Sequence, residues 1–150
     1  MTEVAFYHLT RSSLEQALPK LLEKTLEAGK RALVRAGDAK RVQFINDALW
    51  SYDPASWLPH GSSKDGEAEH QPVWITDGDD APNGAQFVFL TDGVAGDDFS
   101  AFERGFVLFD GTSDAAVGAA RQQWKAYTDQ GLELTYWQQT DAGGWTKKDT

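Results

Sequence analysis

Short apolar runs alternate along the chain with longer segments in which apolar residues recur at helical spacing. The runs VAFYHL (4–9) and RALVRAG (31–37) are compact enough for buried strands. The segments 12–29 and 38–52 each carry an apolar stripe, which predicts a helix after each of these strands. This β-α-β-α order predicts a parallel sheet with right-handed crossovers, and therefore an α/β fold.

Residues that begin and end helices stand close to these boundaries. Ser12 or Ser13 can cap the first helix, and Gly29 ends it. Asp38 is the expected cap of the second helix. Pro19 lies in the first turns, where its missing N–H costs less.

The second half of the chain begins with one long connection and then adds further strands and one helix. Residues 54–72 are rich in Pro, Gly, Ser and charge, which is typical of a functional or partly disordered loop. Strands are predicted at 72–76, 85–92, 105–110 and 132–139, a loop with a short helical turn at 93–103, and a helix at 113–131 capped by Ser113 or Asp114. We expect the tail from about residue 138 to fray, although Trp145 can fold back onto the domain.

Composition fits one globular domain. The 150 residues suffice for a hydrophobic core, and 41% of them are apolar. There is no cysteine, so disulfides and thiolate chemistry are excluded. The N-terminus MTEVAFYHL has no signal-peptide pattern, and no apolar run reaches the roughly 20 residues of a membrane span. We therefore expect a cytoplasmic protein that does not contact a membrane.

Charge is distributed unevenly. Fourteen Lys and Arg against 23 Asp and Glu give a net charge of -9, which argues against direct binding to nucleic acid. Eight of the 14 basic residues lie between Arg11 and Arg41, whereas the segment 65–110 holds 11 acids and the single base Arg104. An anionic partner should therefore dock near the ends of the chain.

The loops with which such sheets bind nucleotides are missing. No GxGxxG or GxxxxGK[ST] pattern occurs, and Gly29-Lys30 lies between a helix and a strand, the wrong context for a phosphate loop. The pair Ser62-Ser63 is not part of a nucleophile elbow. We therefore expect a mostly parallel, Rossmann-like sheet flanked by helices, without a phosphate-binding loop and without a cofactor.

The three histidines form no catalytic or metal-binding pattern. His8 lies in the first predicted strand, where a satisfied core or edge residue is expected. His60 and His70 share the long loop with several acids, but their separation is wider than the pairs typical of zinc sites. We expect no metal site and no catalytic residue.

Six tryptophans are many for a chain without catalytic motifs. Trp57 lies in PASWLPHG, a proline-bracketed loop in which neither periodicity nor a sheet face supplies a burial partner. Tryptophan is a favoured anchor of protein interfaces. Trp57 therefore either pins its own loop or contacts a partner protein.

The segment ARQQWKAYTDQG (120–131) combines a large aromatic with two cations. At about 100° per residue, Tyr127 faces the sheet, Arg121 and Lys125 reach solvent, and Trp124 lies at the boundary with Val117. In one interpretation these residues form a small apolar hollow with two cations on its rim. Such a hollow suits a peptide that ends in an aromatic residue and a free carboxylate. In the other, Trp124 is core and the cations are solvated.

Four segments together resemble the chi subunit family of bacterial DNA polymerase III. They are AFYHL, GKRALV, DALWSYDPASWLPHG and ARQQWKAYTDQG, and they match in order and spacing from about residue 3 to residue 137. The resemblance implies a non-catalytic replication accessory subunit with an α/β sheet that lacks a phosphate loop. It also implies two partners, the acidic C-terminal tail of the single-stranded DNA-binding protein SSB, which ends in a Pro-Phe carboxylate, and the psi subunit of the clamp loader.

The resemblance also assigns residues to these partners. It places the SSB tail at Arg121, Trp124 and Lys125, where the family has Tyr in place of Trp124. Val117 stands where some members carry a further Lys. The psi contact, or that of another clamp-loader subunit, falls on Trp57, Leu58 and Pro59.

Two other classes of protein fit parts of the sequence. One is an α/β enzyme that acts on a small phosphorylated substrate, with His8 or His60 as acid or base. The missing anion-binding loop counts against it. The other is an acidic, Trp-rich inhibitor or immunity protein that mimics nucleic acid.

Overall fold

The computed structural model describes residues 3–10, 13–51, 61–62, 71–77, 84–94, 99, 102–140 and 144–148. Strands and helices alternate over residues 3–51 as the sequence predicts, and four strands then precede the last helix of the described residues. In order they are β1 (Glu3–Leu9), α1 (Leu14–Glu27), β2 (Ala32–Arg35), α2 (Ala39–Ser51), β3 (Gly61–Ser62), β4 (Val73–Thr76), β5 (Phe87–Leu90), β6 (Arg104–Asp110), α3 (Asp114–Asp129), β7 (Glu133–Gln139) and β8 (Trp145–Lys148).

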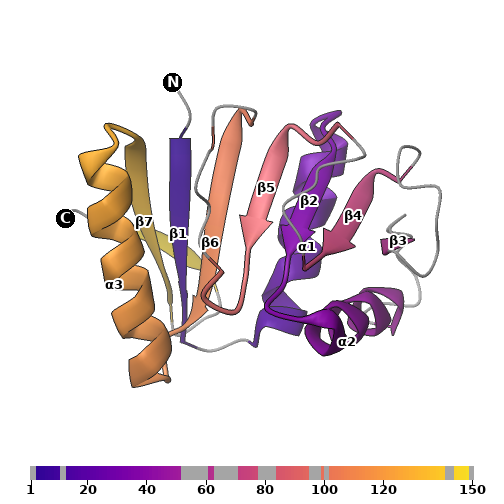
Figure 1. Ribbon diagram of the computed structural model, residues 1–150, viewed down its shortest axis with the longest axis horizontal. Helices are drawn as coiled ribbons and strands as arrows, with labels where there is room; N and C mark the ends of the chain where they lie inside the picture. Colours follow the sequence, from indigo (N-terminus) through magenta and orange to yellow (C-terminus); the bar gives the residue numbers. More distant parts are fainter. Residues whose placement is uncertain are drawn as a thin grey trace.

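The described strands form one mostly parallel sheet. Their order is β3-β4-β2-β5-β6-β1-β7-β8, and every pair is parallel except β7 and β8 (Figure 1). β1 lies at the centre of one half, paired with both β6 and β7. The predicted α/β fold with a mostly parallel, helix-flanked sheet is confirmed.

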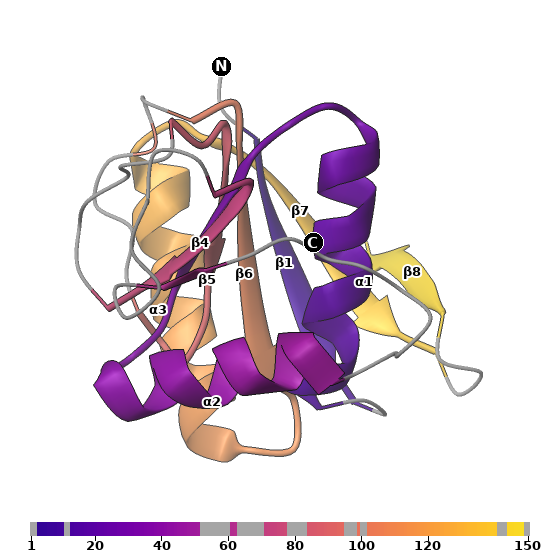
Figure 2. The same cartoon turned by 90° about the vertical axis from the view of Figure 1, so that its right-hand side faces the viewer.

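Alternate strand residues feed two cores, one on each face of the sheet. Tyr7 and Phe89 point to the face covered by α1 and α2, together with leucines of α1 and Ile45 of α2. Phe6 and Phe109 point to the opposite face, where Tyr127 of α3 packs on them. Figure 2 shows α1 and α2 on one side of the strands and α3 on the other. Burial on both faces explains the continuous apolar runs.

The helix boundaries follow the predicted caps. The Gln16 side chain accepts a hydrogen bond from the Ser13 N–H, Asp38 accepts from the Arg41 N–H at 2.9 Å, and Ser113 Oγ accepts from the Ala116 N–H at 3.2 Å. Gly29 follows α1 with a φ of 75°, a conformation that glycine adopts without strain.

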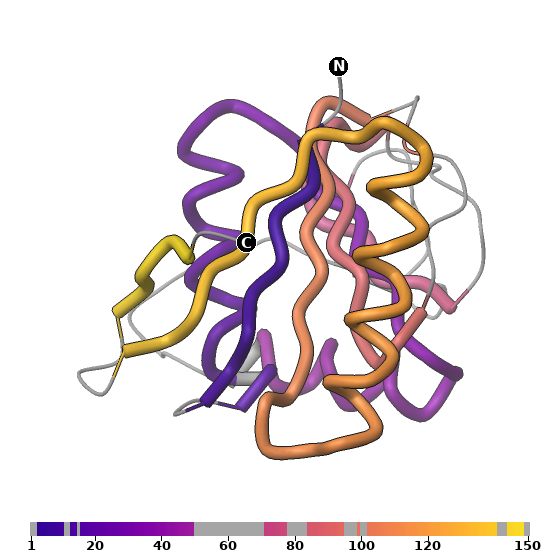
Figure 3. The backbone as a smooth tube through the Cα atoms, turned by 90° about the vertical axis from the view of Figure 1, so that its left-hand side faces the viewer, coloured from indigo at the N-terminus to yellow at the C-terminus, as the bar shows by residue number. Residues whose placement is uncertain are grey.

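Two expectations about irregular segments are corrected. Gln138 and Gln139 complete β7, and Trp145–Lys148 return as β8, where the edge of the Trp145 ring packs on Tyr7 at 4.9 Å. In the described part of the tail, β8 therefore pairs with β7 along the edge of the sheet, and Trp145 packs against the core (Figure 3). Within the expected long loop, Gly61 and Ser62 pair with β4. The predicted helical turn over 93–103 lies largely outside the described residues.

Candidate functional site

A pocket of about 340 Å³ opens between α3 and the sheet. We call it the α3 pocket. The sheet supplies its floor and the helix its wall. The floor consists of Phe6 and His8 of β1, Phe109 of β6 and Tyr136 of β7, and the wall of Val117, Ala120, Arg121 and Trp124.

Helical periodicity decides which side chains of α3 reach the pocket. Ala120, Gln123 and Tyr127 are buried against the sheet, and Arg121 and Lys125 are exposed. The predicted inward and outward faces of this helix are therefore confirmed.

Trp124 is partly buried at the boundary of these two faces. Its ring packs edge-on against Phe6 at 5.1 Å and against Tyr136 at 6.0 Å between centroids. The ring also lines the pocket. Trp124 thus contacts both the core and the surface, as expected if this segment forms an apolar hollow with cations on its rim.

Three of the four residues predicted for this site meet in the α3 pocket. Val117, Arg121 and Trp124 line it, whereas Lys125 is exposed on the next turn and does not line it. In the described part of the chain, no carboxylate forms an ion pair with Arg121 or Lys125. The rim of an apolar pocket therefore carries positive charge that no carboxylate among the described residues pairs with.

The floor carries two polar groups, His8 and Tyr136. His8 Nδ1 and the Tyr136 hydroxyl are hydrogen-bonded, and the His8 ring lies 4.9 Å from that of Phe109. Burial lowers the pKa of His8, and a hydrogen bond to the Gly111 backbone partly offsets this effect. Burial raises the pKa of Tyr136, against the opposing effect of the nearby Arg121 guanidinium.

Sequence reasoning missed the floor of the pocket. His8 is hydrogen-bonded within its strand surroundings, as expected of a satisfied residue, but that it also lines a cavity beside Tyr136 was not predicted. The available signal is the period of two along β1, which places Phe6 and His8 on one face. The alternation along β1 does not reveal which strands lie next to it, so it cannot predict that Phe109 and Tyr136 lie beside these residues.

The residues predicted for a second partner, Trp57, Leu58 and Pro59, lie outside the described residues, as do His60 and His70. The next described residues, Gly61 and Ser62, form β3 at the opposite end of the sheet from β8.

A second cavity, of about 800 Å³, lies at the carboxyl ends of the strands. β1 leads into α1 on one face and β6 into α3 on the other, so this is the crevice where such sheets bind nucleotides. Here, however, protein side chains cap the amino ends of α1, α2 and α3.

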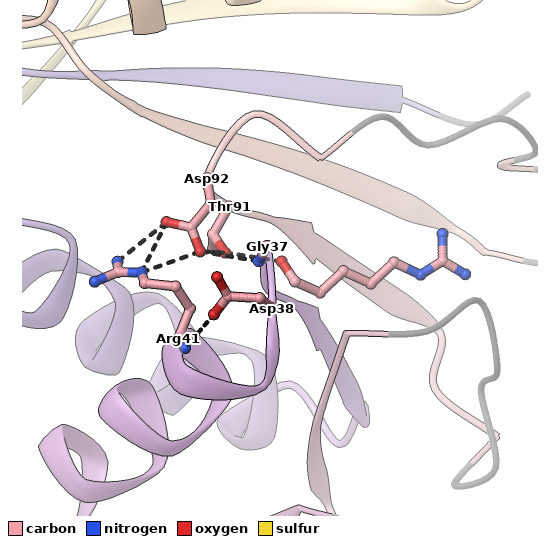
Figure 4. A network of polar contacts seen from close by, with 6 residues as sticks. Gly37, Asp38, Arg41, Thr91 and Asp92 are labelled. Carbon is pink, nitrogen blue, oxygen red and sulfur yellow. Dashed lines mark hydrogen bonds and ion pairs between the residues drawn. The ribbon is translucent and has the colours of Figure 1, made fainter.

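The wall of this crevice is also occupied by an internal network of polar contacts. Arg41 pairs with Asp92 at 3.1 Å, and Asp92 accepts a hydrogen bond from the Gly37 N–H at 3.1 Å (Figure 4). Both charges are therefore already matched within the protein. The sequence also contains no glycine-rich pattern of the kind that wraps a phosphate group.

The described residues contain no cluster of three or more His, Asp or Glu side chains placed to hold a metal ion. None of the described helices is both long and apolar enough to cross a membrane.

Comparison with known proteins gives consistent results. The family model for the DNA polymerase III chi subunit, HolC, matches residues 1–135. The probable DNA polymerase III subunit chi of Rickettsia prowazekii (strain Madrid E) is 28% identical over 90 residues, which cover 60% of this chain and only 54%, about half, of that relative. The DNA polymerase III subunit chi of Escherichia coli (strain K12) is 25% identical over 123 residues, 82% of this chain and 84% of the relative. The chain therefore belongs to the DNA polymerase III chi subunit family, a family of replication proteins.

Proposed function

We propose that this protein is a non-catalytic, cytoplasmic accessory subunit that binds the acidic C-terminal tail of SSB in the α3 pocket and links it to the polymerase III clamp loader. One observation supports the proposed binding of the SSB tail. The pocket combines an apolar, aromatic lining with Arg121 at its rim and Lys125 beside it, on a protein whose net charge is -9. Local positive charge on an acidic protein favours a small anionic ligand over a long polyanion.

The chemistry of the tail fits the two parts of the pocket. A terminal Phe side chain can lie against Phe6, Val117 and Trp124, because these side chains leave an apolar cavity open to solvent. An aromatic side chain buries about 150–250 Å² when it is fully enclosed. The terminal carboxylate and the acids upstream can then pair with Arg121 and Lys125.

The affinity of one tail should be modest. The charged contacts are exposed, and a disordered peptide loses conformational entropy when it binds. Several tails on one SSB assembly would raise the effective affinity without any further contact.

Calorimetry with an acidic peptide that ends in Pro-Phe tests this function. We expect the free-acid peptide to bind and the amidated peptide to bind about tenfold more weakly, since the amide removes the charge that Arg121 meets. Arg121→Ala should weaken binding of the free acid by about tenfold or more. Lys147→Ala, which removes an exposed cation on β8, is the matched control and should change nothing. Equal binding of acid and amide would contradict the proposal.

The link to the clamp loader is proposed for Trp57, Leu58 and Pro59. The reason is the resemblance of the segment DALWSYDPASWLPHG to the family, together with the preference of interfaces for tryptophan. Affinity capture from cell extract with wild type and Trp57→Ala tests it. We expect Trp57→Ala to lose psi or another clamp-loader subunit and to retain SSB. Loss of neither, or of both, would contradict separate sites.

A further inference from the structure

His8 and Tyr136 are polar residues at the floor of a pocket that is otherwise mainly apolar. Their side chains are hydrogen-bonded to each other, through His8 Nδ1 and the Tyr136 hydroxyl. The opposite edge of the imidazole, with Nε2 and Cδ2, lies against Gly111. Both nitrogens of His8 thus have defined neighbours.

These neighbours favour one arrangement of protons in the neutral pair. The Gly111 backbone favours the charged form of His8, as an acceptor beside a ring N–H does, and Nε2 is the ring nitrogen that lies against Gly111, so we infer that the neutral ring carries its proton on Nε2. A neutral imidazole with its proton on Nε2 can only accept at Nδ1. Tyr136 therefore donates its hydroxyl proton to His8, and its oxygen offers only lone pairs to the pocket. A lone pair does not attract a carboxylate.

A second proton on His8 reverses this arrangement. Protonated His8 donates from Nδ1, so the Tyr136 oxygen becomes the acceptor of that bond and its own O–H is free to turn toward the pocket. The Arg121 guanidinium is close enough to Tyr136 to affect the pKa of its phenol. One carboxylate could then meet the Tyr136 hydroxyl and Arg121 together.

We propose that His8, Tyr136 and Arg121 form a proton-coupled carboxylate receptor, so that a peptide with a free C-terminus binds the α3 pocket more tightly when His8 is protonated. This inference rests on the proposed function and adds to it a set of residues that recognises the terminal carboxylate of the peptide. His8 acts through Tyr136 and is a positioning residue.

The groups around His8 agree with this assignment. On α3 the facing charge is Arg121, with Lys125 farther out, and on β7 the titratable group is Tyr136. At the end of β6, Asp110 is exposed and hydrogen-bonded to Thr112, which lowers the pKa of its carboxyl. Asp110 therefore stays ionised near neutral pH and contributes no titration there. Among the described residues no carboxylate lies within hydrogen-bonding distance of His8, so the negative charge that would stabilise its protonated form has to come from a ligand bound at Tyr136 and Arg121.

The test is the affinity of the acidic Pro-Phe peptide between about pH 8 and pH 5.5, a range in which histidine titrates and ordinary carboxylates stay ionised. We expect binding to tighten by a factor of about three to ten toward the acid end, because a pKa one unit higher in the complex gives its full tenfold effect only well below the lowered pKa of free His8. His60→Gln/His70→Gln leaves His8 as the only histidine and should keep the response. His8→Gln should abolish it, and Tyr136→Phe should reduce it at least by half.

A second measurement uses the wild type alone. In a titration followed by NMR, the peptide should raise the pKa of the His8 imidazole, since linkage requires the same coupling in both directions. Binding that is independent of pH, or an unchanged His8 titration with peptide bound, would overturn the inference and leave the proposed function intact. No binding at any pH would overturn both.

Discussion

Gly111 is placed where no side chain fits. A Cβ atom there would collide with the His8 ring and lie 2.7 Å from the Leu9 carbonyl oxygen, which already accepts the Gly111 N–H. The backbone on both sides belongs to β1 and to the turn after β6, so it cannot yield cheaply. The glycine is therefore required by close approach rather than by an unusual φ.

Gly111→Ala should accordingly destabilise the protein by about 1–3 kcal/mol, the usual cost of overpacking. Gly118→Ala is the matched control, because a Cβ at Gly118 meets nothing within 4 Å and the residue lies within α3. That change should leave stability unchanged or raise it by up to about 1 kcal/mol. Urea denaturation of both variants measures the difference, and equal stabilities would contradict the role assigned to Gly111.

At the scale of elements, β8 stabilises the face of the sheet opposite to the α3 pocket. Trp145 packs with Tyr7 and with the core beneath α1, whereas the pocket faces α3. β8 should therefore matter for stability and not for peptide binding.

Trp145→Ala should lower the free energy of unfolding by about 2 kcal/mol, less than for a fully buried tryptophan, because the ring is only partly covered. Affinity for the acidic peptide should stay within about twofold of wild type. Urea denaturation and calorimetry on the same preparation separate the two effects. The assignment would be wrong if binding were lost while stability stayed unchanged.

Some of the helices and strands can be predicted from the sequence alone, and others cannot. Apolar runs and helical stripes predict β1, β2, α1, α2 and α3, since each buries a continuous or periodic apolar set. β8 escapes this reasoning because WTKK has one large apolar residue, and its backbone pairing with β7 makes it a strand.

The sequence likewise predicts one part of the α3 pocket and not the other. Its helical wall follows from the spacing of Val117, Arg121 and Trp124 along one segment. Its floor depends on β1 pairing with both β6 and β7, which lie about a hundred residues or more away along the chain. A local pattern carries no information about such pairing.

At the scale of the whole molecule, the net charge of -9 should oppose the approach of the proposed acidic peptide, whereas Arg121 and Lys125 should attract it at close range. The two effects differ in range. Repulsion by the whole surface acts during approach, whereas the cations act on the bound peptide.

Salt should therefore affect the two rate constants in an unusual combination. Raising NaCl from about 0.05 M to 0.5 M shortens the screening length to a few ångströms. Association should become about twofold faster as the repulsion is screened, and dissociation about fivefold to tenfold faster as the contacts to Arg121 and Lys125 weaken. Stopped-flow tryptophan fluorescence measures both. Association that slows with salt would show that local attraction governs the approach as well.

The two ends of the sheet limit what can join it. An open strand edge is a template for strands of other molecules, and proteins block such edges with very short strands or with lysines. The described sheet ends in the two-residue β3 on one side and in β8, with the exposed Lys147 and Lys148, on the other. Neither edge invites a further strand. The edges of the described sheet thereby protect the protein from aggregation through its own backbone.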